Sequence, residues 1–145
     1  MIYKWKIPGL IPVDAQVAGQ EMERIYNRDG ILDPAVVVME SKDEHAPLHR
    51  CFEWNDTVAA NKYRVNQAKE IIRSIVTVSE HTNQETRAFV HVNREYQPLS
   101  VVIRNPEDTA TLLRQAINEL RWFEQKYSKL QELAGVMAEI GKVVV

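Results

Sequence analysis

The most regular pattern in this sequence begins at Asn105 and predicts one long C-terminal helix. Residues 105–108 combine a capping side chain, a first-turn proline and two acids that suit the positive end of a helix dipole. Apolar residues then recur at alternating steps of three and four, as at the a and d positions of a coiled coil: Leu113, Ala116, Leu120, Phe123, Tyr127, Leu130, Ala134 and Met137. This set, termed the a/d seam, predicts a helix over 105–140 that Gly135 weakens near its end.

The a/d seam has two interpretations. It can pack within one chain, over a sheet and the N-terminal helices, or it can join the chain to a second copy or another protein. A helix of about 25 to 30 residues is roughly 40 Å long, and a domain of this size would leave part of it uncovered. We therefore expect self-association as a dimer or higher oligomer, with large aromatic side chains among the anchors. The predicted interface residues are Leu120, Trp122, Phe123, Tyr127 and Leu130.

The first half of the chain predicts a group of short helices. Periodic apolar residues and end signals place them at 15–29, from Asp33-Pro34 onward, from Pro47 to Cys51, and at 56–76. Asp14 and Asp33 are good N-caps. Three consecutive valines after Asp33-Pro34 favour a strand locally, but the cap and the proline favour a helix. Asn55 or Asp56 is expected to cap the helix over 56–76.

Three short runs of alternating, β-branched residues predict a small antiparallel sheet. They are Val76–Val78, Arg87–Val92 and Leu99–Ile103. Residues 1–12 predict an extended arm in which Ile2, Trp5 and Ile7 pack on the body. The predicted class is α+β, with a single domain over 1–145 that consists of an arm (1–12), a helical part (13–78), a β part (79–104) and the long helix (105–140).

Composition limits the locations and partners that we expect. With 20 acidic and 18 basic side chains, the net charge is −2, so nucleic-acid binding would need a local basic face and not a field of the whole domain. No apolar run approaches the roughly 18 to 20 residues of a membrane span, and residues 1–10 lack the apolar region of a secretory signal. We expect no membrane partner. The single cysteine, Cys51, fits a reducing cytoplasm.

The helix predicted over 56–76 carries a narrow stripe opposite an apolar face that includes Tyr63 and Ile71. The stripe, termed the basic stripe, consists of Lys62, Asn66, Lys69 and Arg73. Its cations could lie along nucleic-acid phosphates, and its amide could read an adenine edge. The short helices also suit a helix-turn-helix variant with a β-hairpin behind it. The alternative is a solvated helix face, which a protein of balanced charge commonly carries.

A compact group of apolar side chains, Leu48, Phe52 and Trp54, leads directly into this helix. Arg64 falls on the apolar side of the helix and not on the basic stripe. We therefore expect Arg64 to pair with a carboxylate at the edge of the core, with Glu53 as the partner.

Sequence motifs for catalysis are absent. His45, His49 and Cys51 are zinc-type ligands, but a structural zinc site usually needs four ligands, and no second pair follows at finger-like spacing. Apolar neighbours indicate a buried, structural thiol at Cys51. The glycine-rich phosphate loops and the common hydrolase motifs do not occur. We expect no metal, no cofactor and no enzymatic activity.

Three segments carry a recognisable pattern: PLHRCFEW, AANKYRVNQA and ELRWFEQKYSKLQELA. Its central residues are Pro47, Leu48, His49, Phe52, Glu53, Trp54, Tyr63, Arg64, Gln67 and Ala68. The pattern resembles a family of small phage and prophage proteins, over about Asp14 to Ile140. Lys69 stands where that family more often has arginine, which keeps the charge. The resemblance implies a phage context, and it supplies no activity and no catalytic residues.

Two functions of different classes follow as hypotheses. The first is a non-enzymatic phage protein that acts as an oligomer and either binds nucleic acid, such as DNA, or has a regulatory role. The basic stripe would meet the phosphates. The second is a protein-interaction module that inhibits or recruits a host or defence protein, or assists phage assembly. The near-neutral charge favours the second. Both place the chain in the cytoplasm of a host cell.

Overall fold

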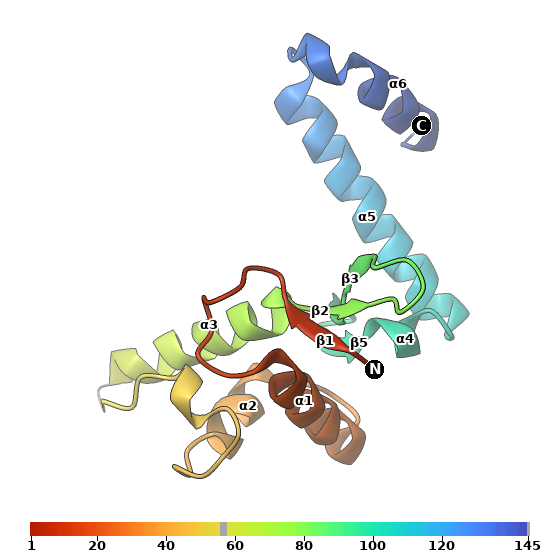
Figure 1. Cartoon of the computed structure of the whole chain (residues 1–145). Coiled ribbons are helices and arrows are strands. Elements are labelled where there is room, and N and C mark those ends of the chain that lie inside the picture. The colour runs from red at the N-terminus through yellow and green to blue at the C-terminus, as the bar shows by residue number, and fades with distance from the viewer. Residues whose placement is uncertain (56–57, 145) are drawn as a thin grey trace. The chain divides into compact units, whose positions relative to one another are not determined.

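The computed structural model describes residues 1–55 and 58–144 (Figure 1). The chain divides into two compact units, Met1–Val102 and Ile103–Val145, termed unit 1 and unit 2. The described helices and two small antiparallel sheets confirm the predicted α+β class.

The helices predicted for the first half of the chain are present in unit 1. They are α1 (Ala15–Asp29), α2 (Pro34–Glu40), the 3-10 turn η1 (His49–Cys51) and α3 (Val58–Ser74). The carboxylate of Asp14 accepts hydrogen bonds from two backbone N–H groups at the start of α1, at 2.9 and 3.2 Å. Asp33 accepts one from Ala35 at 2.9 Å. Such caps contribute about 1 kcal/mol each. Asp56, one of the two predicted caps of α3, lies outside the described residues.

The N-terminal arm is part of a three-stranded antiparallel sheet (Figure 1). The strands, in the order β1-β2-β3, are β1 (Tyr3–Trp5), β2 (Ile75–Val78) and β3 (Glu85–Arg87). Successive side chains of a strand point to opposite faces, so Tyr3 and Trp5 are both buried in β1. The predicted packing of Trp5 is confirmed. The predicted packing of Ile2 and Ile7 is wrong, because both side chains are exposed.

A second sheet is the hairpin of β4 (Phe89–Val92) and β5 (Glu95–Pro98). The strand predicted over Leu99–Ile103 is wrong, because Leu99–Val102 forms the short helix α4. The physical reason is the tight turn: Val92 lies opposite Glu95, so the chain returns as a strand directly after two residues. The N–H group of Leu99 still donates to the carbonyl oxygen of Ala88 at 2.9 Å, and the chain then turns into α4.

The core of unit 1 collects side chains from both sheets, the helices and the loops. Its largest buried members are Met22, Ile25, Leu32, Leu48, Ile71, Ile72, Ile75 and Phe89. The buried indole of Trp5 keeps its hydrogen bond, since Nε1 donates to the carbonyl oxygen of Val13 at 2.7 Å. The N-terminal arm is thus an integral part of the core and not an appendage.

Gly19 of α1 lies against the ring of Tyr3, and a Cβ atom at this position would overlap that ring. We expect Gly19→Ala to lower the free energy of unfolding by about 1–3 kcal/mol, even though alanine is the better helix former. Urea unfolding followed by circular dichroism measures the change. Gly135→Ala is the matched control, because a Cβ in that helix meets open space and should stabilise by up to about 1 kcal/mol. If Gly19→Ala and Gly135→Ala change the free energy of unfolding in the same direction, the close packing of β1 on α1 is contradicted.

Unit 2 is a pair of helices and not a single long helix. It contains α5 (Pro106–Tyr127), the 3-10 turn η2 (Gln131–Leu133) and α6 (Ala134–Val143). Asn105 caps α5 as predicted, with hydrogen bonds from Glu107 and Asp108 at 3.0 and 3.3 Å. The helix predicted over 105–140 is wrong in its length, because α5 ends at Tyr127 and Leu130 has extended backbone angles (φ −84°, ψ 104°).

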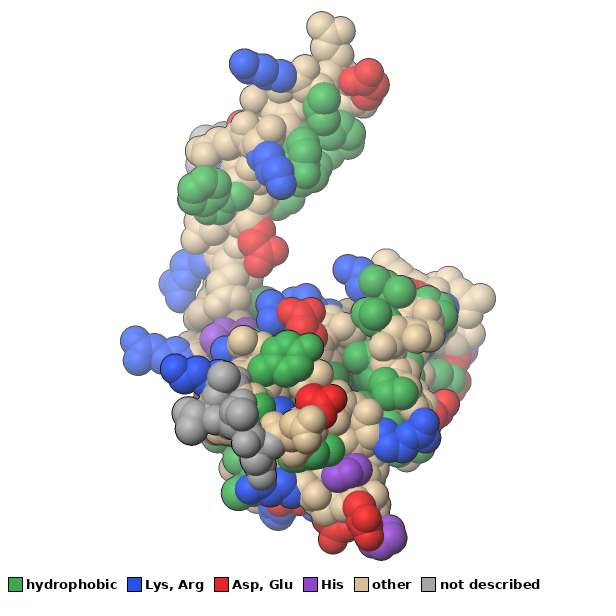
Figure 2. Space-filling view, turned by 90° about the vertical axis from the view of Figure 1, so that its left-hand side faces the viewer, with side chains coloured by type: hydrophobic (Ala, Val, Ile, Leu, Met, Phe, Trp, Pro, Cys, Tyr) green, Lys and Arg blue, Asp and Glu red, His purple; other side chains and the backbone are tan. Residues whose placement is uncertain are grey.

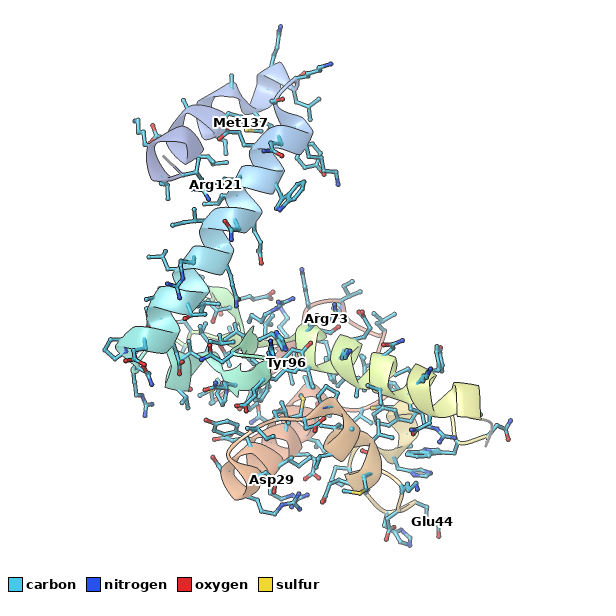
Figure 3. The ribbon with its side chains drawn as sticks, turned by 180° about the vertical axis from the view of Figure 1, so that it is seen from behind. Asp29, Glu44, Arg73, Tyr96, Arg121 and Met137 are labelled. Carbon is cyan, nitrogen blue, oxygen red and sulfur yellow. The ribbon has the colours of Figure 1, made fainter. Side chains whose placement is uncertain are left out.

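The two helices of unit 2 lie alongside each other. Figure 3 labels Arg121 on α5 and Met137 on α6. The guanidinium of Arg121 donates two hydrogen bonds to the carbonyl oxygen of Val144, at 2.9 and 3.3 Å. The C-terminal part of the a/d seam therefore folds back toward α5. In a continuous helix it would lie farther along the same axis.

Candidate binding surfaces

The basic stripe lies on α3, as predicted. Lys62, Asn66 and Arg73 are exposed, and Lys69 is half-buried. The spacing of four, three and four residues places all of them on one side of the helix. Figure 3 shows Arg73 near the end of α3 and Tyr96 in the β4–β5 hairpin. The structure thus brings the predicted residues together on one surface.

Part of the charge of this stripe is already neutralised. The guanidinium of Arg73 pairs with Glu70 at 3.1 Å, and its Nε atom donates a hydrogen bond to the backbone carbonyl of Lys69 at 3.3 Å. An exposed pair of this kind is weak, so a phosphate could compete for Arg73. The helices α2 and α3 do not match a helix-turn-helix closely. Residues 41–57 separate them, whereas that motif has a turn of three to four residues.

Arg64 is buried beneath this surface, with 3% of its area exposed. Its Nε atom donates to the carbonyl oxygen of Glu53 at 2.5 Å, and its Nη2 atom donates to that of Asn55 at 3.1 Å. The predicted position at the core is confirmed, but the predicted contact with the Glu53 carboxylate is wrong: the backbone carbonyl accepts the bond. The planar guanidinium can serve several carbonyls at once, so it ties the segment before α3 to the helix.

A stack of three side chains surrounds this arginine. The rings of His49 and Trp54 stack at 5.0 Å with 7° between their planes, and the guanidinium carbon of Arg64 lies 4.9 Å from the Trp54 ring centre. Trp54 Nε1 donates to the carbonyl oxygen of His49 at 2.8 Å, and His49 Nδ1 lies 2.9 Å from the carbonyl oxygen of Ser41. His49, Trp54 and Arg64 of the sequence segments PLHRCFEW and AANKYRVNQA therefore have a structural role, in which they hold the segment before α3 against the helix.

Within residues 1–55 and 58–144, the candidate metal and nucleophile residues are not gathered into one group. Burial raises the pKa of the Cys51 thiol to about 11, so very little reactive thiolate is present near neutral pH. His45 is exposed and lies 3.7 Å from Glu44. Across residues 1–55 and 58–144, no three His, Cys, Asp or Glu side chains gather as metal ligands would.

A groove that the sequence did not predict runs beside the basic stripe. It encloses about 310 Å³ between the N-terminal arm and α3, and its walls include Leu10, Ile11, Cys51, Tyr63, Asn66 and Gln67. Leu10 and Tyr63 are 64% and 57% exposed. The prediction that Tyr63 faces the core is wrong, because the arm stops short of covering it. The sequence carried no signal for this groove, because its pattern places Tyr63 on the apolar face of the helix.

The five predicted interface residues all belong to unit 2. Leu120, Phe123 and Tyr127 are half-buried on the a/d seam of α5, and the Phe123 and Tyr127 rings lie 5.0 Å apart. Trp122 lies on a different side of the helix and is 71% exposed. Leu130 is exposed in the turn after α5. An open hollow of about 560 Å³ adjoins Trp122, Phe123 and Tyr127.

In the part of the chain that the structure describes, no helix combines the length and the apolar character needed to cross a membrane. No family model, curated protein or solved structure matches the chain. The surfaces described above are therefore the basis for any functional proposal.

Proposed function

We propose that the chain is a non-enzymatic binding protein that self-associates through unit 2 and binds its ligand with unit 1. The observation that carries this proposal is the exposure of α5. Among the described residues of unit 2, only Ile140 is buried, and α5 contains no buried residue in its 22 positions. Figure 2 shows hydrophobic side chains uncovered along the helices of this unit.

A pair of helices with so small a core needs further packing. The stability of a helix in a protein comes chiefly from packing of its apolar face, and a unit this small buries a smaller fraction of its surface than a domain of ordinary size. Leu120, Phe123 and Tyr127 are half-buried and lie on one side of α5. This side is an apolar surface that a partner can cover. This argues that the a/d seam of α5 is completed by another surface.

A second copy of the chain is the partner that suits this face. The first turn of α5 carries Glu107 and Asp108, and its last turn carries Lys126. Two α5 helices packed antiparallel would therefore place acidic ends beside basic ends. Two such hairpins form a four-helix bundle with a twofold axis, in which the same residues contribute from both copies. Light scattering after gel filtration tests the proposal, which predicts a dimer or larger oligomer and is contradicted by a monomer at all concentrations.

A nucleic acid is the ligand of unit 1 that the basic stripe favours. Its supporting observation is the single face shared by Lys62, Asn66, Lys69 and Arg73. We expect the double substitution Lys69→Glu with Arg73→Glu to abolish binding to a mixed-sequence DNA duplex and to leave the melting temperature nearly unchanged, because these side chains lie outside the core. Fluorescence anisotropy at about 50 and 200 mM salt measures binding, which should weaken steeply with salt.

Lys42→Glu with Arg50→Glu is the control for this prediction. Both side chains are exposed and lie outside α3, and the change in net charge is the same. If the control variant and the stripe variant lose equal affinity, the binding reflects overall charge. If the stripe variant keeps full affinity for DNA and RNA, the stripe is a solvated helix face.

A protein is the second candidate ligand of unit 1, and the groove with Leu10 and Tyr63 favours it. The groove has an apolar wall and includes the exposed ring of Tyr63, and aromatic side chains are enriched in the cores of protein interfaces. A host or defence protein, or a phage assembly partner, would fit the phage context that the sequence pattern implies. Weak DNA binding that salt removes, together with a stable complex from host lysate that Tyr63→Asp disrupts, would favour this candidate.

A further inference from the structure

A second hollow in unit 1 lies at the junction of the α1–α2 loop, α3 and the β4–β5 hairpin. It encloses about 220 Å³ and is lined by Ile31, Leu32, Asp33, Pro34, Lys69, His91, Arg94, Glu95 and Tyr96. Four of these side chains carry a formal charge, two of each sign. None of the predicted functions uses the hollow as a site.

The walls of this hollow are held by backbone and ring contacts. The N–H group of Leu32 donates to the carbonyl oxygen of Tyr96 at 3.1 Å, which joins the α1–α2 loop to β5. The rings of His91 and Tyr96 meet edge to face at 4.9 Å. Leu32 and Tyr96 are themselves buried, so the hollow is formed before any ligand arrives, as ligand sites usually are.

The charged side chains around the hollow do not form ion pairs with one another. Within the described chain, neither the Lys69 ammonium nor the Arg94 guanidinium has an ion-pair partner closer than 4.0 Å. One carboxylate oxygen of Asp33 caps α2 by accepting a hydrogen bond from the N–H group of Ala35. The second oxygen does not take part in this cap. Glu95 supplies another carboxylate. A ligand with both an anionic and a cationic group would match this set, whereas a simple anion would meet two carboxylates.

The backbone at Arg94 supports a role for its side chain. Asn93 and Arg94 form the two-residue turn between β4 and β5 and have φ angles of 54° and 66°. Such turns favour asparagine followed by glycine, because residues with a Cβ atom are strained in the left-handed region. Arginine occupies the glycine position here, and its side chain lines the hollow. Strain that persists in this way is common at functional sites.

From this juxtaposition we propose that the hollow binds a small zwitterion, an α-amino acid with an apolar side chain. Its carboxylate contacts Lys69 and Arg94, and its ammonium group contacts Glu95 and the free oxygen of Asp33. Its side chain lies against Ile31 and Pro34. This site is separate from self-association through unit 2. It shares only Lys69 with the basic stripe, so a bound amino acid would compete with phosphate for that one cation.

Isothermal titration of the full chain with leucine tests the proposal. Leucine should bind, and N-acetyl-leucine and leucine amide, which each keep only one of the two charges, should bind at least about tenfold more weakly, as loss of one charge-assisted contact implies. No leucine binding overturns the proposal. Equal binding of N-acetyl-leucine overturns it too, since the hollow would then be an anion site only. Neither result bears on the mass measured by light scattering.

Arg94→Gly is expected to change the melting temperature and the leucine affinity in opposite directions. Relief of the strained backbone should raise the melting temperature by about 2 to 4 °C, while leucine affinity should fall by at least about tenfold. Asn83→Gly is the matched control, because Asn83 also has a positive φ of 53° and lies outside the hollow. It should keep full leucine affinity. A folded Arg94→Gly variant with unchanged leucine affinity overturns the role of Arg94 and the proposal with it.

Discussion

Replacing Arg64 with alanine is expected to lower the free energy of unfolding by about 3–5 kcal/mol. The substitution removes the hydrogen bonds to the Glu53 and Asn55 carbonyls, each worth roughly 1.5–3 kcal/mol, and the contact with the Trp54 ring, worth about 0.5–2 kcal/mol. It also empties a buried position. Without the guanidinium, the carbonyl groups of Glu53 and Asn55 lose the donor that joins them to α3. Urea unfolding monitored by tryptophan fluorescence measures the loss.

Two further variants make this prediction specific. Arg64→Lys keeps the charge but not the planar fork, so it should recover only a small part of the stability. Arg50→Ala removes an exposed arginine from the same segment and should change the stability by less than about 0.5 kcal/mol. A loss below about 1 kcal/mol for Arg64→Ala would show that the stack of His49, Trp54 and Arg64 does not hold the segment before α3.

The second large effect concerns unit 2. Leu120→Asp with Phe123→Asp is expected to convert the oligomer completely to monomer. Both side chains lie on the a/d seam, and an aspartate buried at an apolar interface without a partner is strongly unfavourable. Light scattering measures the mass, and circular dichroism should show loss of helix from α5 and α6 while unit 1 retains its structure.

The control for this pair places the same charges elsewhere on α5. Asn118→Asp with Gln125→Asp adds two aspartates at exposed positions away from the a/d seam, and the oligomer should remain intact. If the control pair also yields monomers, the effect is one of net charge. If the variant with Leu120→Asp and Phe123→Asp keeps the mass of the unaltered chain, the a/d seam is not the interface.

Local signals in the sequence were sufficient for most helices of this protein. Asp14, Asp33 and Asn105 cap the helices that they were predicted to cap, because a cap depends on a few neighbouring backbone groups. The strand at Glu95–Pro98 was missed, since a polar segment with a turn at Asn93-Arg94 gives a weaker pattern than the valines after it. Residues 95–98 form a strand because they pair with β4.

Features that depend on distant parts of the chain could not be predicted from periodicity. The spacing of the a/d seam continues through Leu130, so it gave no sign that the helix ends at Tyr127 and that α6 folds back. The charged hollow joins Lys69 to Arg94 across two elements, and each residue alone resembles ordinary surface. The four stripe residues share one side of α3, whereas Leu130, predicted on the long helix, lies in the turn after α5.

Hydrogen exchange of the α5 amides as a function of protein concentration tests the central claim most directly. If a second copy completes the a/d seam, residues 106–127 should be protected at high concentration and should exchange progressively faster on dilution, because association stabilises them by mass action. The amides of α1 and α3 in unit 1 should not change. Protection of α5 that is independent of concentration would contradict self-association through this helix.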